Sequence, residues 1–310
     1  MNNKLVKKIN QLVNNYFFYD DKKIKNIQKR RIFKKFINIY REAETYSINK
    51  NSKNLPGSFF GKINKKPFLV VVKTKKIFLK TVLKYIGNLN NKNILIKPNF
   101  VSVDSYPETT DLCLLFDFIV LLKKSFKNLK ISIADGPSIF FNDSLIFERL
   151  ENKYKKIIIK NNISVINVLG KKYCQYRTKQ KLLKYINLPY FLKKYDYLIN
   201  FSNFKEHNRA GISGPIKNLM GLLPDFERLR IHKFKKNINK AIYELGKIIG
   251  SDFIIVDARK ILIGSQQRIY GGKEIKGFGI LFTNNLFLGN KKSIEFYKKI
   301  YKKNYGTLST

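Results

Sequence analysis

Several residue types are scarce in this 310-residue sequence, and each scarcity excludes a class of protein. Two cysteines are too few for a disulfide scaffold or for an iron–sulfur cluster held by about four thiolates. Tryptophan is absent and histidine occurs only twice. No apolar run reaches the roughly 18 residues that a membrane-spanning helix needs, and the N-terminus does not open like a secretion signal. We therefore expect a cytoplasmic protein without a membrane span or an iron–sulfur cluster of its own.

Acidic residues are also scarce, and the chain is strongly basic as a result. Asp and Glu total 21 against 62 Lys and Arg, which gives a formal net charge of +41 at pH 7. Two explanations remain open. The abundant Lys, Asn, Ile, Phe and Tyr are encoded by A- and T-rich codons, so a drifting genome would produce this composition without selection. Alternatively, the charge serves weak, salt-dependent binding of a polyanion such as RNA.

The first 60 residues are expected to form a basic helical extension. Phe33, Phe36, Ile37 and Tyr40 lie three and four positions apart, which predicts a helix with one apolar stripe. Lysines and arginines crowd residues 22–35 around that stripe. The stripe favours docking on the rest of the protein, whereas the charge would suit a phosphate-rich surface. The turn-rich residues 55–58 mark the predicted boundary, with the extension at 1–60 and the main domain at 61–310.

Beyond this boundary, short apolar strands alternate with helices. This pattern predicts an α/β layered fold with a mostly parallel central sheet. Strands are expected at 68–72, 93–97, 130–134, 164–168, 196–201, 252–256 and 279–282. Helices are expected at 77–86, 111–126, 144–151, 216–222, 239–249 and 292–302.

Polar residues follow four of the predicted strands. Parallel strands end at one edge of their sheet, and ligands bind at that edge in open α/β folds. We therefore expect Lys97, Asp135, His207, Lys217 and Asp257 to meet there. Strand exits are also polar simply because they meet water, and this second explanation stays open. The four expected loops are 97–100, 135–138, 202–207 and 257–260.

The loop at 205–221 has the composition of an anion site. Gly211 and Gly214 allow tight turns, and Pro215 suits the first position of a helix. Backbone N–H groups at that helix start, with neighbouring lysines, would bind a phosphate or a carboxylate. The alternative is a helix start with solvated lysines. The expected ligand-binding residues are Lys97, Asn99, Lys205, Gly214, Lys217 and Asn218.

The two histidines flank the helix predicted in this region. A neutral imidazole can transfer a proton or bind a metal near neutral pH. His207 and His232, together with Asp135 or Asp257, could hold one divalent ion. These four residues are the expected catalytic groups. Their spacing does not distinguish acid–base chemistry from metal binding.

Five ordered segments carry a family resemblance. The most specific is the block Lys-Asn-Leu-Met-Gly at 217–221, which is followed by Pro224 and His232. Over about residues 90–290 the sequence resembles the "domain of unknown function 362" family. The other segments are 96–101, 134–138, 197–207 and 256–258.

The resemblance implies a cytosolic α/β protein whose biochemical role is generally unassigned. Many members of the family carry ferredoxin-type clusters on an attached cysteine-rich module, and a remote similarity to the lactate racemase group has been suggested. This sequence departs from the family at 264–267, which reads Gly-Ser-Gln-Gln instead of Gly-Asn-Gly-Pro. Asparagines also replace two aspartates within residues 283–290.

These observations lead to two functional hypotheses of different classes. The first is an enzyme-like protein that binds a small phosphate or carboxylate at the carboxyl edge of its sheet and uses acid–base or metal-assisted chemistry. The second is a non-catalytic RNA- or ribosome-associated basic protein. The location of the positive charge distinguishes them, because a buried lysine cluster favours the first and an exposed stripe on residues 22–35 favours the second.

Overall fold

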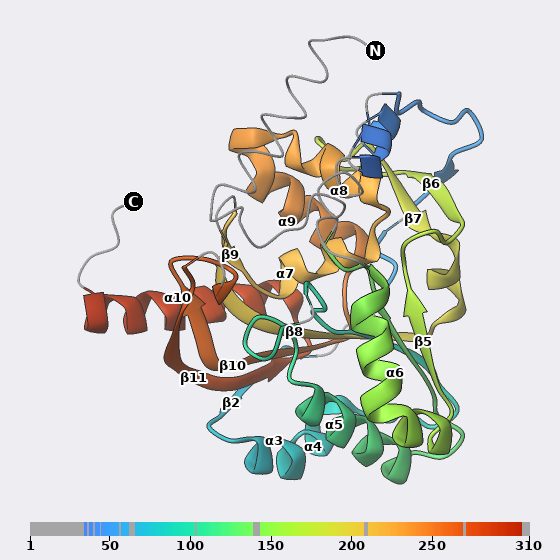
Figure 1. The fold of residues 1–310 in the computed structure, drawn as a ribbon. Helices are drawn as coiled ribbons and strands as arrows, with labels where there is room; N and C mark the ends of the chain where they lie inside the picture. The colour runs from blue at the N-terminus through green and yellow to red at the C-terminus, as the bar shows by residue number, and fades with distance from the viewer. Residues whose placement is uncertain are drawn as a thin grey trace.

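The computed structural model describes residues 34–305, except for 36, 40, 44, 56, 62–65, 103, 139–142, 208–209 and 269–270 (Figure 1). The described residues exclude most of the basic segment at 22–35. They also exclude three residues of the predicted stripe, which are Phe33, Phe36 and Tyr40. Within the extension, Ile39 and Ala43 are buried against Phe226 and Leu229. This part of the extension therefore docks on the main body through Ile39 and Ala43, which do not belong to the predicted stripe, so the docking of the stripe stays a prediction.

A mixed sheet forms the centre of the fold, in the order β2-β11-β10-β8-β3-β4-β5, with β9 paired to β8. The strands from β10 to β5 are parallel, whereas β11 is antiparallel to both of its neighbours. The predicted α/β fold with a mostly parallel central sheet is confirmed. The strand bounds are β2 Leu69–Val72, β3 Asn93–Lys97, β4 Lys130–Asp135, β5 Ile163–Asn167, β8 Tyr197–His207, β9 Gly211–Ser213, β10 Phe253–Ile263 and β11 Lys273–Thr283.

Helices cover both faces of the sheet because successive strand side chains point to opposite sides. Leu95 and Leu198 belong to one buried cluster, and their neighbours Ile94 and Ile199 belong to the other. The first cluster packs under α7 (Pro215–Asn218), α9 (Ile238–Ile249) and α10 (Leu286–Tyr305). The second packs against α3 (Lys75–Thr81), α4 (Leu83–Ile86), α5 (Leu112–Ser125) and α6 (Asp143–Lys160). Figure 1 shows α3, α4 and α5 below the sheet and α7 and α9 above it.

A second, three-stranded sheet was not predicted. It contains β1 (Lys53–Asn54), β6 (Tyr173–Arg177) and β7 (Tyr185–Pro189). Strand β6 reads Tyr-Cys-Gln-Tyr-Arg, which lacks an apolar run, so its pairing partners rather than its own pattern make it a strand. Helix α8 (Asp225–His232) and the 3₁₀ turns η2 (Tyr190–Lys194) and η4 (Lys235–Asn237) were also missed, whereas η3 (Leu219–Leu222) lies within the helix expected at 216–222.

Two of the loop predictions are wrong, because the residues continue the strands that precede them. Residues 202–207 belong to β8, where Lys205 pairs with Ser213 of β9. Residues 257–260 belong to β10, where Asp257 pairs with Ile280 of β11. In both cases an antiparallel neighbour supplies backbone hydrogen bonds beyond the end of the parallel sheet. None of the helices that the structure describes is long and apolar enough to cross a membrane.

Two predicted helices also have different bounds. The helix expected at 216–222 is α-helical only in α7 and continues as η3, so it is too short to act as an extended helix dipole. The last helix starts at Leu286 rather than at 292. Asn285 Oδ1 accepts a hydrogen bond from Leu288 N at 2.9 Å, which is the geometry of an N-terminal cap. One of the asparagines at 283–290 therefore has a structural role.

Candidate functional site

Lys97 and Asp135 form a buried ion pair at the carboxyl ends of β3 and β4. The distance from Lys97 Nζ to Asp135 Oδ1 is 2.7 Å, and the two residues are only 1% and 2% exposed. Asp135 also accepts hydrogen bonds from Phe100 N at 2.6 Å and from Gly136 N at 2.7 Å. Burial lowers the pKa of Lys97, and the Asp135 carboxylate opposes this shift. The predicted meeting of these two strand ends is observed.

A chain of side-chain amides extends from this ion pair toward Lys205. Asn218 Nδ2 donates to the backbone oxygen of Lys97 at 3.1 Å and to Asn200 Oδ1 at 2.8 Å. Asn218 Oδ1 accepts from Asn99 Nδ2 at 3.0 Å, and Asn99 Oδ1 accepts from Lys205 Nζ at 3.2 Å. Lys97, Asn99, Lys205 and Asn218, all predicted from the sequence, therefore share one network.

Lys205 and Lys217 give this site an excess of positive charge. Neither amine lies within ion-pair distance of a carboxylate in the part of the chain that the structure describes. Lys205 is 1% exposed and donates to Asn99 and to the backbone oxygen of Glu108. The Lys217 amine has no hydrogen-bond partner among the described residues.

The environment of these two lysines disfavours their charged forms. Burial, and then the charge of Lys217, lower the pKa of Lys205 to about 7. Burial, and then the charges of Arg228 and Lys97, lower the pKa of Lys217 to about 8. The four cationic groups therefore interact electrostatically at one place, and an anion there would favour protonation of both amines.

Arg228 of α8 completes the cationic group, and sequence reasoning missed it. It donates from NH1 to the backbone oxygens of Gly136 at 3.0 Å and Pro137 at 2.7 Å, and it forms an ion pair with Asp225. Its Nε is buried without a hydrogen-bond partner among the described residues. Pro224 and Asp225 are typical of a helix start, but no sequence signal marks Arg228 as part of a site.

Gly221, the last residue of the Lys-Asn-Leu-Met-Gly block, allows η3 to approach the ion pair. A Cβ atom at this position would overlap Asp135 Oδ1 and would lie 2.6 Å from Lys97 Nζ. The Gly221 backbone oxygen accepts a hydrogen bond from Gly136 N at 2.8 Å. Gly214 is also closely packed, since a Cβ atom there would lie 3.1 Å from Asn290 Oδ1.

Glu108 is a second residue that the sequence did not reveal. It is 1% exposed, and its Oε1 accepts a hydrogen bond from Arg268 N at 2.6 Å. Its Oε2 is buried with no hydrogen-bond partner in the described part of the chain. Burial raises the pKa of Glu108 to about 7. Together with Lys205, which contacts its backbone, Glu108 supplies a group that exists in both protonation states near neutral pH.

Asp257 belongs to a separate polar cluster. It alternates with Val256 and Ala258 of the first hydrophobic cluster, so its side chain faces the opposite side of the sheet from Lys97. Asp257 pairs with Arg259 at 2.7 Å and accepts a hydrogen bond from Tyr106 Oη at 2.9 Å. The predicted convergence thus includes Lys97, Asp135 and Lys217, whereas Asp257 lies at the same edge but is held by Arg259 and Tyr106.

The two histidines contact backbone atoms near the site. His207, at the end of β8, accepts a hydrogen bond at Nδ1 from Ala210 N at 3.2 Å. His232, at the end of α8, has its Nδ1 2.7 Å from the backbone oxygen of Arg228. Asp135 and Asp257 are each engaged by a cation in different clusters. The described residues contain no group of three or more His, Cys, Asp or Glu side chains arranged to hold a metal ion.

The sequence matches a family model over residues 94–288, and this model is described as "Domain of unknown function (DUF362)". The chain belongs to this DUF362 family. The matched span runs from β3 into α10 and includes Lys97, Asp135, Lys205, Lys217 and Arg228. The resemblance inferred from the ordered segments is confirmed.

Other comparisons add a distant structural neighbour. No curated protein matches the sequence. A solved structure with a similar chain is the lactate racemase apoprotein from Thermoanaerobacterium thermosaccharolyticum, at 18% identity and a TM-score of 0.48. The aligned region covers 77% of this chain and 58% of that protein, so this DUF362 chain spans little more than half of its neighbour's length.

Proposed function

We propose that this DUF362 protein binds a small phosphate- or carboxylate-bearing ligand among Lys97, Lys205, Lys217 and Arg228. The observation that carries the proposal is that Lys205 and Lys217 lie beside two further cations without a carboxylate partner among the described residues. Lys205 is buried and Lys217 is half-buried, and isolating a cation such as Lys205 from water costs several kcal/mol unless an opposite charge compensates it. A bound anion would compensate both amines at once, and the neighbouring amides of Asn99 and Asn218 would orient it.

Proton transfer on the bound anion is the chemistry that we propose for this site. A general acid or base works best when its pKa lies near the working pH. Lys205 and Glu108 both have a pKa of about 7 and are linked through the Glu108 backbone. In this proposal Asp135 positions Lys97 and Asp257 positions Arg259. His207 and His232 remain candidate acid–base groups.

The test is calorimetric titration of the full chain with inorganic phosphate, pyrophosphate and oxalate. Lys217→Met keeps the apolar stem and removes the charge, and a charge-assisted contact contributes roughly 1.5–3 kcal/mol. The Kd of the preferred anion should therefore rise by about ten- to a hundredfold. Lys124→Met, at an exposed position of α5, is the control and should leave the Kd unchanged. Unaltered binding by Lys217→Met would contradict the proposal.

A further inference from the structure

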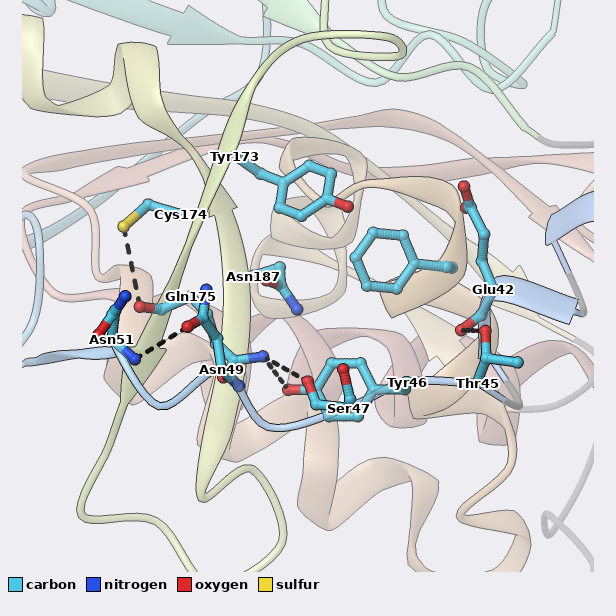
Figure 2. Close-up of a pocket in the computed structure, with 11 residues that line it drawn as sticks. Glu42, Thr45, Tyr46, Ser47, Asn49, Asn51, Tyr173, Cys174, Gln175 and Asn187 are labelled. Atoms are coloured by element: carbon cyan, nitrogen blue, oxygen red, sulfur yellow. Dashed lines mark hydrogen bonds between the residues drawn. The ribbon is translucent and has the colours of Figure 1, made fainter.

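A second cavity of about 400 Å³ lies away from the lysine site, where the extension meets β6, β7 and α8 (Figure 2). Residues 42–51 of the extension form one side, and residues 173–175 of β6 form the other. Asn187 of β7 and Phe226 of α8 complete the lining. The volume lies within the range of small-molecule sites.

Aromatic rings form one wall of this cavity. The ring centroids of Tyr173 and Phe226 are 5.2 Å apart, and those of Tyr46 and Phe226 are 6.3 Å apart. Phe226 is buried, whereas Tyr173 is 52% exposed. Tyr173 therefore has an exposed side chain at the cavity, and its ring meets the buried ring of Phe226 at an interplanar angle of 59°. An exposed ring of this kind would suit the stacking of a planar group.

Amide and hydroxyl groups form the rest of the lining. Gln175 fixes the extension in place, since its Oε1 accepts from Asn49 N at 2.7 Å and its Nε2 donates to Tyr46 Oη and to the Ser47 backbone oxygen, each at 3.2 Å. The side chains of Ser47, Asn51 and Tyr173 make no hydrogen bonds within the described chain. Figure 2 shows Asn51 at one end of the cavity and the Glu42 carboxylate at the other.

The charge of the lining distinguishes this cavity from the lysine site. None of its eleven lining residues is Lys or Arg, although these two types account for 62 of the 310 residues of the chain. The lining therefore suits the uncharged part of a ligand. Exposed lysines lie just outside it, because Lys50 is adjacent in sequence to Asn49 and Asn51, and Lys172 is adjacent to Tyr173.

We propose that this cavity binds one nucleoside unit, either as a free nucleotide or as part of single-stranded RNA. The base would stack on Tyr173, and the free Asn51 amide would both donate to and accept from its edge. The Glu42 carboxylate would accept hydrogen bonds from ribose hydroxyls. A phosphate on the nucleoside would point out of this cavity, whose lining contains no Lys or Arg, toward Lys50 and Lys172.

Titration of the full chain with four probes tests this site. The probes are adenosine, adenosine monophosphate, ribose 5-phosphate and a six-nucleotide oligoadenylate, observed by saturation-transfer NMR and calorimetry. Base stacking on an aromatic ring is worth about 1–3 kcal/mol, so Tyr173→Ala should raise the Kd of adenosine monophosphate by about five- to a hundredfold. Tyr190→Ala is a matched control, because Tyr190 is 53% exposed and lies outside the cavity lining. It should leave this Kd unchanged.

The probes also identify the source of the nucleoside. Tighter, salt-sensitive binding of the oligomer would indicate RNA, whereas equal or tighter binding of the mononucleotide would indicate a free nucleotide. Ribose 5-phosphate binding as well as adenosine monophosphate in Lys217→Met, where the lysine site is weakened, equal losses in both tyrosine variants, or no binding of adenosine or any nucleotide at millimolar concentration would each overturn the proposal. Adenosine carries no phosphate, so Lys217→Met should leave its binding unchanged, which separates this test from that of the lysine site.

Discussion

At the residue scale, Lys205 and Lys217 should make anion binding depend on pH. Their pKa values of about 7 and about 8 mean that the free protein loses charge from the site as the pH rises through this range. Because the charged amines attract the ligand, affinity for oxalate, which stays doubly charged in this range, should fall between about pH 6.5 and 9. Calorimetry across this range measures the effect, and a flat profile would contradict it. In Lys217→Met only the titration of Lys205 remains, and its pKa should rise because the charge of Lys217 no longer lowers it.

The same lysine pKa values predict that, without ligand, the free energy of unfolding rises with pH, whereas the affinity for the anion falls. Unfolded Lys205 has the ordinary lysine pKa near 10.4, so between about pH 7 and 10 the unfolded chain binds more protons than the folded chain. The contribution of Lys205 to the free energy of unfolding should therefore rise with pH over that interval and stay constant below it. Urea unfolding of the wild type and of Lys205→Met, in anion-poor buffer, isolates this contribution. The free energy of unfolding of the wild type minus that of the variant should rise with pH over this interval. A difference that falls would contradict the low pKa of Lys205.

At the element scale, the position of η3 depends on the missing side chain of Gly221. Gly221→Ala would push η3 away from the ion pair of Lys97 and Asp135 or displace that pair. Overpacking of this kind costs roughly 1–3 kcal/mol, so the free energy of unfolding should fall by about that amount. Anion affinity should fall as well.

Gly57→Ala is the control for this substitution, because a Cβ atom at Gly57 would meet no atom within 4 Å. Urea denaturation and phosphate titration of both variants provide the measurements. Full stability and full affinity in Gly221→Ala would show that η3 can shift without affecting the site.

Residues 202–207 and 257–260 were expected to form loops, but they belong to β8 and β10. The lengths of these two strands therefore determine where the site residues lie. Apolar runs predicted where each strand begins, but polar residues such as Ser202, Asn203 and Lys205 do not indicate a strand. They are held in β8 because β10 and β9 pair with it. Lys205 is thereby carried past the end of β3, where its amine reaches Asn99. Partner strands thus extend an element beyond its own sequence pattern.

At the scale of the whole molecule, the extension packs against the main body in two hydrophobic clusters. Ile39 and Ala43 belong to a small cluster with α8, whereas Phe60, at the end of the extension, belongs to the large cluster of the sheet. Deletion of residues 1–55 removes Ile39, Ala43 and strand β1 and keeps Phe60. We expect the truncated protein to unfold cooperatively at a lower temperature than the full chain. Calorimetry measures this, and loss of a cooperative transition would show that residues before 56 belong to the main core.

The same truncation tests RNA binding through the basic extension. Fewer phosphate neutralisations should lower the affinity for RNA and reduce its dependence on salt concentration. The deletion also removes Glu42, Ser47 and Asn51 from the second cavity. Comparison with Tyr173→Ala in the full chain separates the two contributions. Unchanged RNA affinity and salt dependence after truncation would contradict a role for the extension.

The sequence alone determined the α/β fold class, the DUF362 family and the neighbouring positions of Lys97 and Asp135. The family follows from the resemblance of the ordered motif segments, whereas the fold class and the strand ends follow from local patterns, since alternating apolar strands and helices dictate a parallel sheet whose strand ends share one edge. Only the tertiary structure placed Arg228, Glu108 and Gly221 at the site, put Asp257 beside Arg259 and Tyr106, and formed the cavity beside Tyr173. It also decided the pKa values of Lys205 and Lys217. Burial and charge pairing depend on contacts between residues far apart in the chain, and no local pattern encodes them.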